Sequence, residues 1–331
     1  MAKCGMSITA IAVSFLILLH LPSLCTASIR ESVHFIPPSD VDLLEFPLNL
    51  EYLEAEFFLF SSLGHGLDKV APDLAMGGPS PVGAQKAKLS PFIKDIITQF
   101  AYQEVDHVRA IKDTVKGFPR PLLNLSSESF TEVMDRALGC WTNPPFDPYA
   151  NDVNFLLASY IIPNIGLTGY AGANPKLKSA ASKKLVAGLL GIESGQDAVI
   201  RALLYEHAGE KVEPYGVTVA EFTERISELM NKLGHAGTKD EGIVVPKDNG
   251  GTVAPKDNGG TVAPKDEGAE GKTSGNVLAG DEYSLAYART PEEVLRILYG
   301  EGNEHVPGGF YPNGANGRIA KCHLATKTHS K

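Results

Sequence analysis

Apolar residues recur at helical spacing through residues 40–235, and no part of that stretch alternates apolar and polar positions as a strand would. The connection between the second and third long helices, residues 117–150, is itself long and holds a short helix capped by Ser129 and Glu132. We therefore expect an all-α four-helix bundle with a long crossover between its second and third helices. The predicted long helices cover about 40–63, 88–116, 151–172 and 175–209, and a fifth helix covers about 218–233.

The pattern changes after Gly234, which ends the predicted helical domain of residues 35–235. A nine-residue Pro/Lys/Asp/Gly repeat without large apolar residues follows, and such a composition cannot bury a core. We expect residues 236–275 to be a disordered, low-complexity linker. Residues 276–331 then form a C-terminal segment with a short helix capped at Thr290 and a Gly-rich turn motif.

The first 27 residues have the features of a signal peptide. Lys3 precedes an apolar run at residues 8–21, and small residues lead to Ala27, after which we expect cleavage. A retained signal anchor is the alternative. Cleavage would make the protein secreted and extracellular, in the apoplast or cell wall.

In a secreted protein, three other residues are candidates for covalent modification. Asn124 heads an N-x-S sequon in a predicted loop, so it is a candidate glycosylation site. Cys140 and Cys322 are the cysteines that remain after cleavage, and an oxidising compartment would allow a disulfide that ties the tail to the core.

The net charge of the chain limits the kinds of partner it can bind. The formal net charge is −9, and removing residues 1–27 takes away one Lys and no acid, which leaves about −10. An acidic chain without a basic cluster is unsuited to nucleic acid, and no second apolar stretch is long enough to hold the mature chain in a membrane. A homo-oligomer and an association with the cell wall both remain compatible with the sequence.

The second long helix carries the most informative polar residues. Glu104 falls in the centre of its apolar stripe and His107 lies close beside it, three residues apart. A buried carboxylate and imidazole are costly unless they are paired or bind metal. The alternatives are a buried Glu–His hydrogen bond, or a helix turned so that the pair reaches solvent. The stripe comprises Ile93, Ile97, Phe100, Val108 and Ile111.

Two other helices add candidates. Glu193 and Gln196 repeat the same spacing in the fourth long helix, although a glutamine oxygen is a weaker ligand than a histidine nitrogen. The first helix offers Glu51 as the preferred ligand and Glu54 as the second choice, while Glu56 points elsewhere and is expected at the surface.

The third long helix lacks a candidate acid. Residues 153–172 contain no Asp or Glu, and only Asn154, Tyr160 and Asn164 could replace one. A bundle that binds two metal ions uses about six ligands, most of them carboxylates, so the predicted site is incomplete.

Several runs in this order resemble the plant desiccation-related proteins, a ferritin-like family. The resemblance implies a ferritin-like four-helix bundle, secretion, and accumulation during water deficit. It covers about residues 35–235 and a C-terminal motif. The runs are LNLEYLEAEFF (48–58), YQEVDH (102–107), SYIIPNIGLTGYAGANP (159–175), GIESGQDAVIRALLYE (191–206) and PGGFYPNGANGRIA (307–320).

The resemblance also implies a ligand set. In ferritin-like proteins each of two helices gives a Glu and each of the other two gives Glu-x-x-His; in this chain Gln196 replaces the second His. We expect a degenerate site that holds at most one iron or manganese ion, in a non-catalytic, secreted water-stress protein. The alternative is a metal-binding oxidoreductase or an iron- or manganese-handling protein. The matching positions are Glu51, Glu104, His107 and Glu193.

Overall fold

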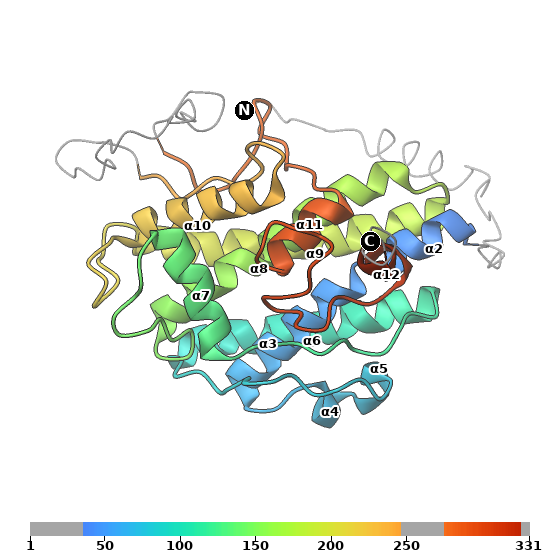
Figure 1. Ribbon diagram of the computed structural model, residues 1–331, viewed down its shortest axis with the longest axis horizontal. Helices are drawn as coiled ribbons and strands as arrows, with labels where there is room; N and C mark the ends of the chain where they lie inside the picture. Colours follow the sequence, from blue (N-terminus) through green and yellow to red (C-terminus); the bar gives the residue numbers. More distant parts are fainter. Residues whose placement is uncertain (1–35, 246–274, 326–331) are drawn as a thin grey trace, which may run out of the picture. The chain divides into compact units, whose positions relative to one another are not determined.

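The computed structural model describes residues 36–245 and 275–325, and within those ranges it contains helices and no strand. Four long helices form the framework. Helix α3 packs along α6, and α8 packs along α9, while the crossover between α6 and α8 carries α7 (Figure 1). The predicted four-helix bundle with a long crossover is therefore confirmed. The bounds are α3 Leu48–Leu63, α6 Pro91–Thr114, α7 Ser127–Leu138, α8 Asp152–Ala173 and α9 Ala180–Glu206.

Helix boundaries follow local chemistry. The predicted first helix is two helices, α2 (Pro38–Glu45) and α3, because Pro47 has no N–H to continue the hydrogen-bond ladder. Ser90 caps α6 through its hydroxyl, which accepts from the N–H of Ile93. The fourth long helix starts later than predicted. Residues Asn174–Lys176 form the 3₁₀ turn η1, and Ser179 caps α9.

Helices α3 and α8 are buried on nearly every face. The C-terminal segment covers the first turn of α3, where the Tyr311 hydroxyl donates to the carbonyl of Asn49 at 2.7 Å and the side chain of Asn49 exchanges two hydrogen bonds with the backbone of Asn316. Beside α8, a Cβ added at Gly172 would lie 2.1 Å from the carbonyl oxygen of Arg289, so this close backbone contact requires glycine.

The predicted linker begins too early. Residues 236–245 pack against the bundle, with Asp240 and Ile243 buried and Arg201 donating to Asp240 at 2.6 Å. The disordered-linker prediction is therefore wrong for these residues, since a buried guanidinium holds them in place. The rest of the repeat, residues 246–274, lies outside the described residues.

The remaining helices add smaller corrections. Ser126 rather than Ser129 caps α7. The predicted capping box of Thr290 and Glu293 is confirmed at α11 (Pro291–Leu298). The predicted fifth helix is α10 (Val219–Gly234). Three short helices were not predicted: α4 (Leu67–Val70), α5 (Pro72–Ala75) and α12 (Arg318–Ala325).

Several predictions concern the ends of the chain or its surface. The predicted signal peptide, with cleavage after Ala27, lies outside the described residues. Cys140 and Cys322 are both exposed, and no bond joins them, so the structure lacks the predicted disulfide. Asn124 is half-buried, and its side-chain oxygen accepts from the N–H of Ser126 at 3.2 Å. No helix in the described ranges has the length and apolar character needed to cross a bilayer.

Candidate metal centre

A buried group of acidic side chains and one histidine lies where three of the long helices face one another. Helix α3 provides one residue, α6 two and α9 one, and a ligand atom from each lies within 4.8 Å of the others. All four side chains are buried, and all four were candidate ligands in the sequence. They are Glu51, Glu104, His107 and Glu193.

His107 is the centre of this group. Its Nδ1 lies 3.1 Å from Glu51, 3.2 Å from Glu104 and 3.6 Å from Glu193. Burial opposes a positive charge on the imidazole, but the carboxylates of Glu51 and Glu104 outweigh it and raise the pKa of His107 far above its usual range. Burial likewise acts to raise the pKa of Glu51, and the attraction of His107 brings that pKa below its ordinary value. Without metal, the imidazolium therefore neutralises one carboxylate.

Glu54, the second-choice ligand of the first helix, adds a further carboxylate to this group. It is completely buried one turn along α3 from Glu51, and neither of its carboxylate oxygens has a hydrogen-bond partner. Both oxygens of Glu193 also lack a hydrogen bond. Burial and the repulsion of Glu193 raise the pKa of Glu54 well above its usual value, and burial raises the pKa of Glu193 to about 7.

Gln196 takes the place of a second histidine. Its amide nitrogen donates to Glu104 at 2.5 Å, while its amide oxygen has no hydrogen-bond partner. Burial and the repulsion of Glu193 raise the pKa of Glu104 well above its usual value. Gln196 therefore orients a carboxylate and leaves one neutral oxygen available as a ligand.

Helix α8 contributes space and a hydrogen bond instead of an acid. A Cβ added at Gly166 would lie 2.8 Å from Oε2 of Glu193 and 3.5 Å from Oε1 of Glu54, so glycine leaves room for both carboxylates. One turn later, the Tyr170 hydroxyl donates a hydrogen bond to Glu51. Gly166 and Tyr170 were not proposed as site residues, and only their i, i+4 spacing could have indicated that they share a face.

The polar residues proposed on α8 lie elsewhere. Asn154 donates to the carbonyl of Asp147, and Tyr160 bonds Ser227. Asn164 accepts from Arg289 at 2.9 Å. None of these three residues therefore takes the place of the missing acid at the centre.

Glu56 is also buried, which corrects the expectation that it lies at the surface. Its carboxylate pairs with the buried guanidinium of Arg120, which also contacts Asp68 at 2.9 Å. The N–H of Leu67 donates to the carboxylate of Glu56 at 3.3 Å. Glu56 is thus a structural ion-pair residue on the same helix as two candidate ligands.

The charges of the centre fit divalent metal ions. Among the described residues, His107 is the one basic side chain that pairs with this group of carboxylates. Four buried carboxylates beside one imidazole are costly, and the oxygens of Glu54 and Glu193, which have no hydrogen bond, are available as ligands. Two divalent cations would balance four carboxylates and a neutral imidazole. The four are Glu51, Glu54, Glu104 and Glu193.

A small cavity lies next to the centre. Gly166 and Tyr170, which both contact carboxylates of the centre, form part of its wall, together with Leu50 of α3. Its volume of about 20 Å³ is enough for a water-sized molecule. Lys176 and Arg289 also line it, so a cavity with mainly apolar walls carries two basic side chains.

Buried carboxylates and a histidine that project inward from a crossover four-helix bundle define the class of ferritin-like metal-binding proteins. Residues 39–206 match the ferritin-like domain, and this match covers half of the chain. The chain therefore belongs to the ferritin-like family, as the resemblance of its motifs implied.

Two relatives are similar over most of their length. The desiccation-related protein PCC13-62 of Craterostigma plantagineum is 60% identical over 283 residues, which are 86% of this chain and 85% of the relative. The ferritin-like catalase Nec2 of Nesocodon mauritianus is 56% identical over 289 residues, 87% of each chain. No solved structure matches the chain at a significant level.

Proposed function

We propose that this protein is a secreted, metal-dependent oxidoreductase that binds two iron or manganese ions and disproportionates hydrogen peroxide. The observation that carries the proposal is the buried group of four carboxylates, two of which have no hydrogen bond at either oxygen. Carboxylate oxygens and one imidazole are ligands suited to iron and manganese. The catalase named among the relatives supports peroxide as the substrate.

The carboxylates and the histidine of the centre would bind the ions. Glu51 and Glu104 each lie within 3.2 Å of Nδ1 of His107, and Glu54 and Glu193 face the space beside Gly166. When bound, redox-active iron or manganese would supply the electron transfer by which two H₂O₂ molecules give one O₂ and two H₂O.

Other side chains keep the ligands in place. Burial raises the pKa of Tyr170 well above its usual value, so its hydroxyl keeps its proton and donates a hydrogen bond to Glu51. The amide nitrogen of Gln196 likewise donates a hydrogen bond to Glu104 and holds that carboxylate in place. The cavity of about 20 Å³ has room for a molecule the size of water or peroxide, which is compatible with a small substrate.

A second candidate function follows from Gln196. With glutamine at the position of the second histidine and no acid at residues 153–172, the bundle would bind metal weakly and act as a non-catalytic water-stress protein in the apoplast. The desiccation-related relative supports this candidate. Both candidates include secretion, for which the sequence of residues 1–27 is the support.

The two candidates differ in metal content and in oxygen release. The protein beginning at Ser28 is purified without chelators, its iron and manganese are counted by mass spectrometry, and oxygen release from hydrogen peroxide is followed with an electrode. Two equivalents of iron or manganese per chain, together with oxygen release that disappears in His107→Ala, support the oxidoreductase. Retained metal without oxygen release, or no retained metal after loading, supports the non-catalytic protein.

A further inference from the structure

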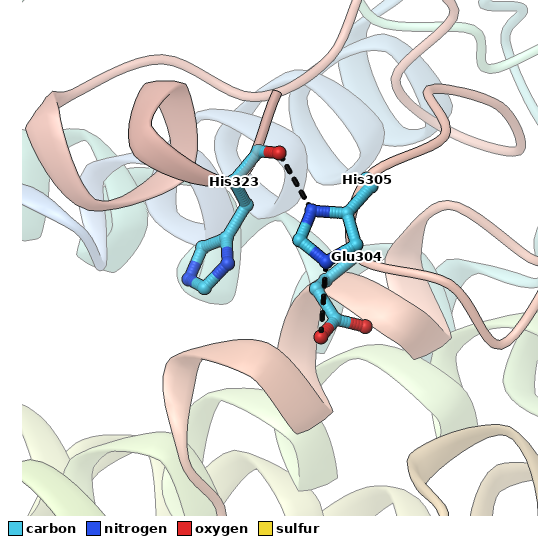
Figure 2. A group of neighbouring side chains, drawn as sticks. All are labelled: Glu304, His305 and His323. Atoms are coloured by element: carbon cyan, nitrogen blue, oxygen red, sulfur yellow. Dashed lines mark hydrogen bonds and ion pairs between the residues drawn. The ribbon is translucent and has the colours of Figure 1, made fainter. Parts of the chain in front are cut away.

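A second group of metal-binding side chains lies in the C-terminal segment. Glu304 and His305 follow α11, and His323 belongs to α12, so chain segments about 18 residues apart meet here (Figure 2). One ligand atom from each of the three residues lies within 4.8 Å of the others. All three side chains are half-buried, so an ion from solvent can reach them.

The hydrogen bonds of His305 fix its tautomer. Its Nδ1 lies 2.6 Å from the backbone carbonyl of His323, and a carbonyl only accepts, so Nδ1 must carry the proton. In the neutral ring, Nε2 then presents a lone pair. That atom faces Oε1 of Glu304 at 3.7 Å, as Figure 2 shows. Two electron-rich atoms facing each other need a cation between them, either a proton or a metal ion.

Arg296 holds the carboxylate of Glu304 in place and in its charged form. Its guanidinium donates to both oxygens of Glu304, at 2.7 and 3.0 Å, and this pairing lowers the pKa of Glu304 to about 2. Each oxygen accepts one bond from Arg296 and keeps a second lone pair. A carboxylate and a histidine whose other atoms are fixed by outer partners form the arrangement that commonly supports a metal ligand.

A fourth donor lies next to the group. Oε1 of Glu292, at the start of α11, is 3.4 Å from Nε2 of His323. Two imidazoles and one carboxylate are within reach of one ion, and the carboxylate of Glu292 lies beside the imidazole of His323. This donor set suits zinc or copper(II), since both prefer imidazole nitrogen over an all-oxygen set.

We propose that Glu304, His305 and His323, with Glu292 beside them, bind one zinc-type divalent transition-metal ion at the protein surface. The ion would join α12 to the segment around α11. The site shares no residue with the bundle centre, so it does not depend on the proposed function. A proton on His305, forming an ion pair with Glu304, is the competing explanation of the same geometry.

The test uses the full mature chain and Zn²⁺ alone. Zinc equivalents are counted by equilibrium dialysis for the wild-type protein, for His323→Ala, which keeps the backbone carbonyl that holds His305, and for His207→Ala. His207 is a matched control because it forms a surface pair with Glu210 at 2.9 Å. We expect His323→Ala to bind one equivalent fewer than the wild type and His207→Ala to bind the same number.

A second measurement guards against a folding defect. With Cu²⁺ as the probe, electron paramagnetic resonance should show coupling to two imidazole nitrogens at this site, and His305→Gln and His323→Ala should each remove it while circular dichroism stays unchanged. Equal zinc stoichiometry and affinity in His323→Ala and wild type would overturn the proposal and leave a proton as the cation on His305.

Discussion

Glu54 and Glu56 allow a sharp comparison, since they are two buried glutamates on one helix with opposite surroundings. Glu54 faces other carboxylates and has no hydrogen bond, whereas Glu56 pairs with Arg120. In protein freed of metal by a chelator, Glu54→Gln should therefore stabilise the fold and Glu56→Gln should destabilise it. In metal-loaded protein, only Glu54→Gln should reduce the number of bound ions.

The stabilisation expected from Glu54→Gln in metal-free protein has an upper limit that depends on pH. Burial and repulsion raise the pKa of Glu54 well above 4.5, so between pH 4.5 and the folded-state pKa this group destabilises the fold, which favours its protonated form. That cost starts near pH 4.5, grows by about 1.4 kcal/mol per pH unit until the folded-state pKa, and reaches at most about 3.5 kcal/mol at pH 7. Glu54→Gln removes it, so we expect the melting temperature to rise by up to about 7–14 °C at pH 7 and to change little below pH 4.5.

The control substitution, Glu56→Gln, should lower the stability of the fold. Glu56→Gln removes one of the two anions that face the buried guanidinium of Arg120, which should cost about 3 kcal/mol. Differential scanning calorimetry of both variants, in chelator and after metal loading, measures all four values. A lower melting temperature for metal-free Glu54→Gln, or an unchanged metal content after loading, would show that Glu54 is not an uncompensated member of the centre.

Three further substitutions test other contacts. Tyr170→Phe removes the hydroxyl that donates to Glu51 and should cost about 1.5–3 kcal/mol in urea unfolding, with unchanged metal content. Gly166→Ala places a Cβ 2.8 Å from Glu193, so metal should be lost faster to a competing chelator; equal loss rates would contradict the close approach. Arg201→Met leaves its two carboxylate partners buried without a cation, which should cost about 3–5 kcal/mol and expose residues 236–245 to limited proteolysis; intact protection would refute this.

The sequence predicted the part of the centre that lies on an amphipathic helix. Helix α6 has a polar face, so its apolar stripe defines which residues point inward, and Glu104 and His107 were found in this way. Helix α3 is buried on nearly every face, so its periodicity identifies no inner side. For that reason Glu56 was placed at the surface.

The rest of the centre depends on contacts between distant segments. Gly166 matters because of the space it leaves for Glu193, and glycine in a helix carries no signal of what its neighbour needs. Residues 236–245 have the composition of a linker, and contacts with distant residues explain their ordered packing. Asp240 pairs with Arg201, and the N–H of Ile243 donates to Thr223. Such pairings arise from tertiary structure and are not visible in local patterns.

The hydrogen bonds between Asn49 and the C-terminal residues Tyr311 and Asn316 have a consequence for the order of synthesis. A ribosome adds Asn49, in the first turn of α3, more than 260 residues before it adds the residues that cover that turn. Until Tyr311 and Asn316 have left the ribosome, the first turn of the helix that carries Glu51 and Glu54 lacks the segment that covers it. Docking of the C-terminal segment is therefore a late step in folding, and a chain truncated before Tyr311 would leave this turn open to solvent.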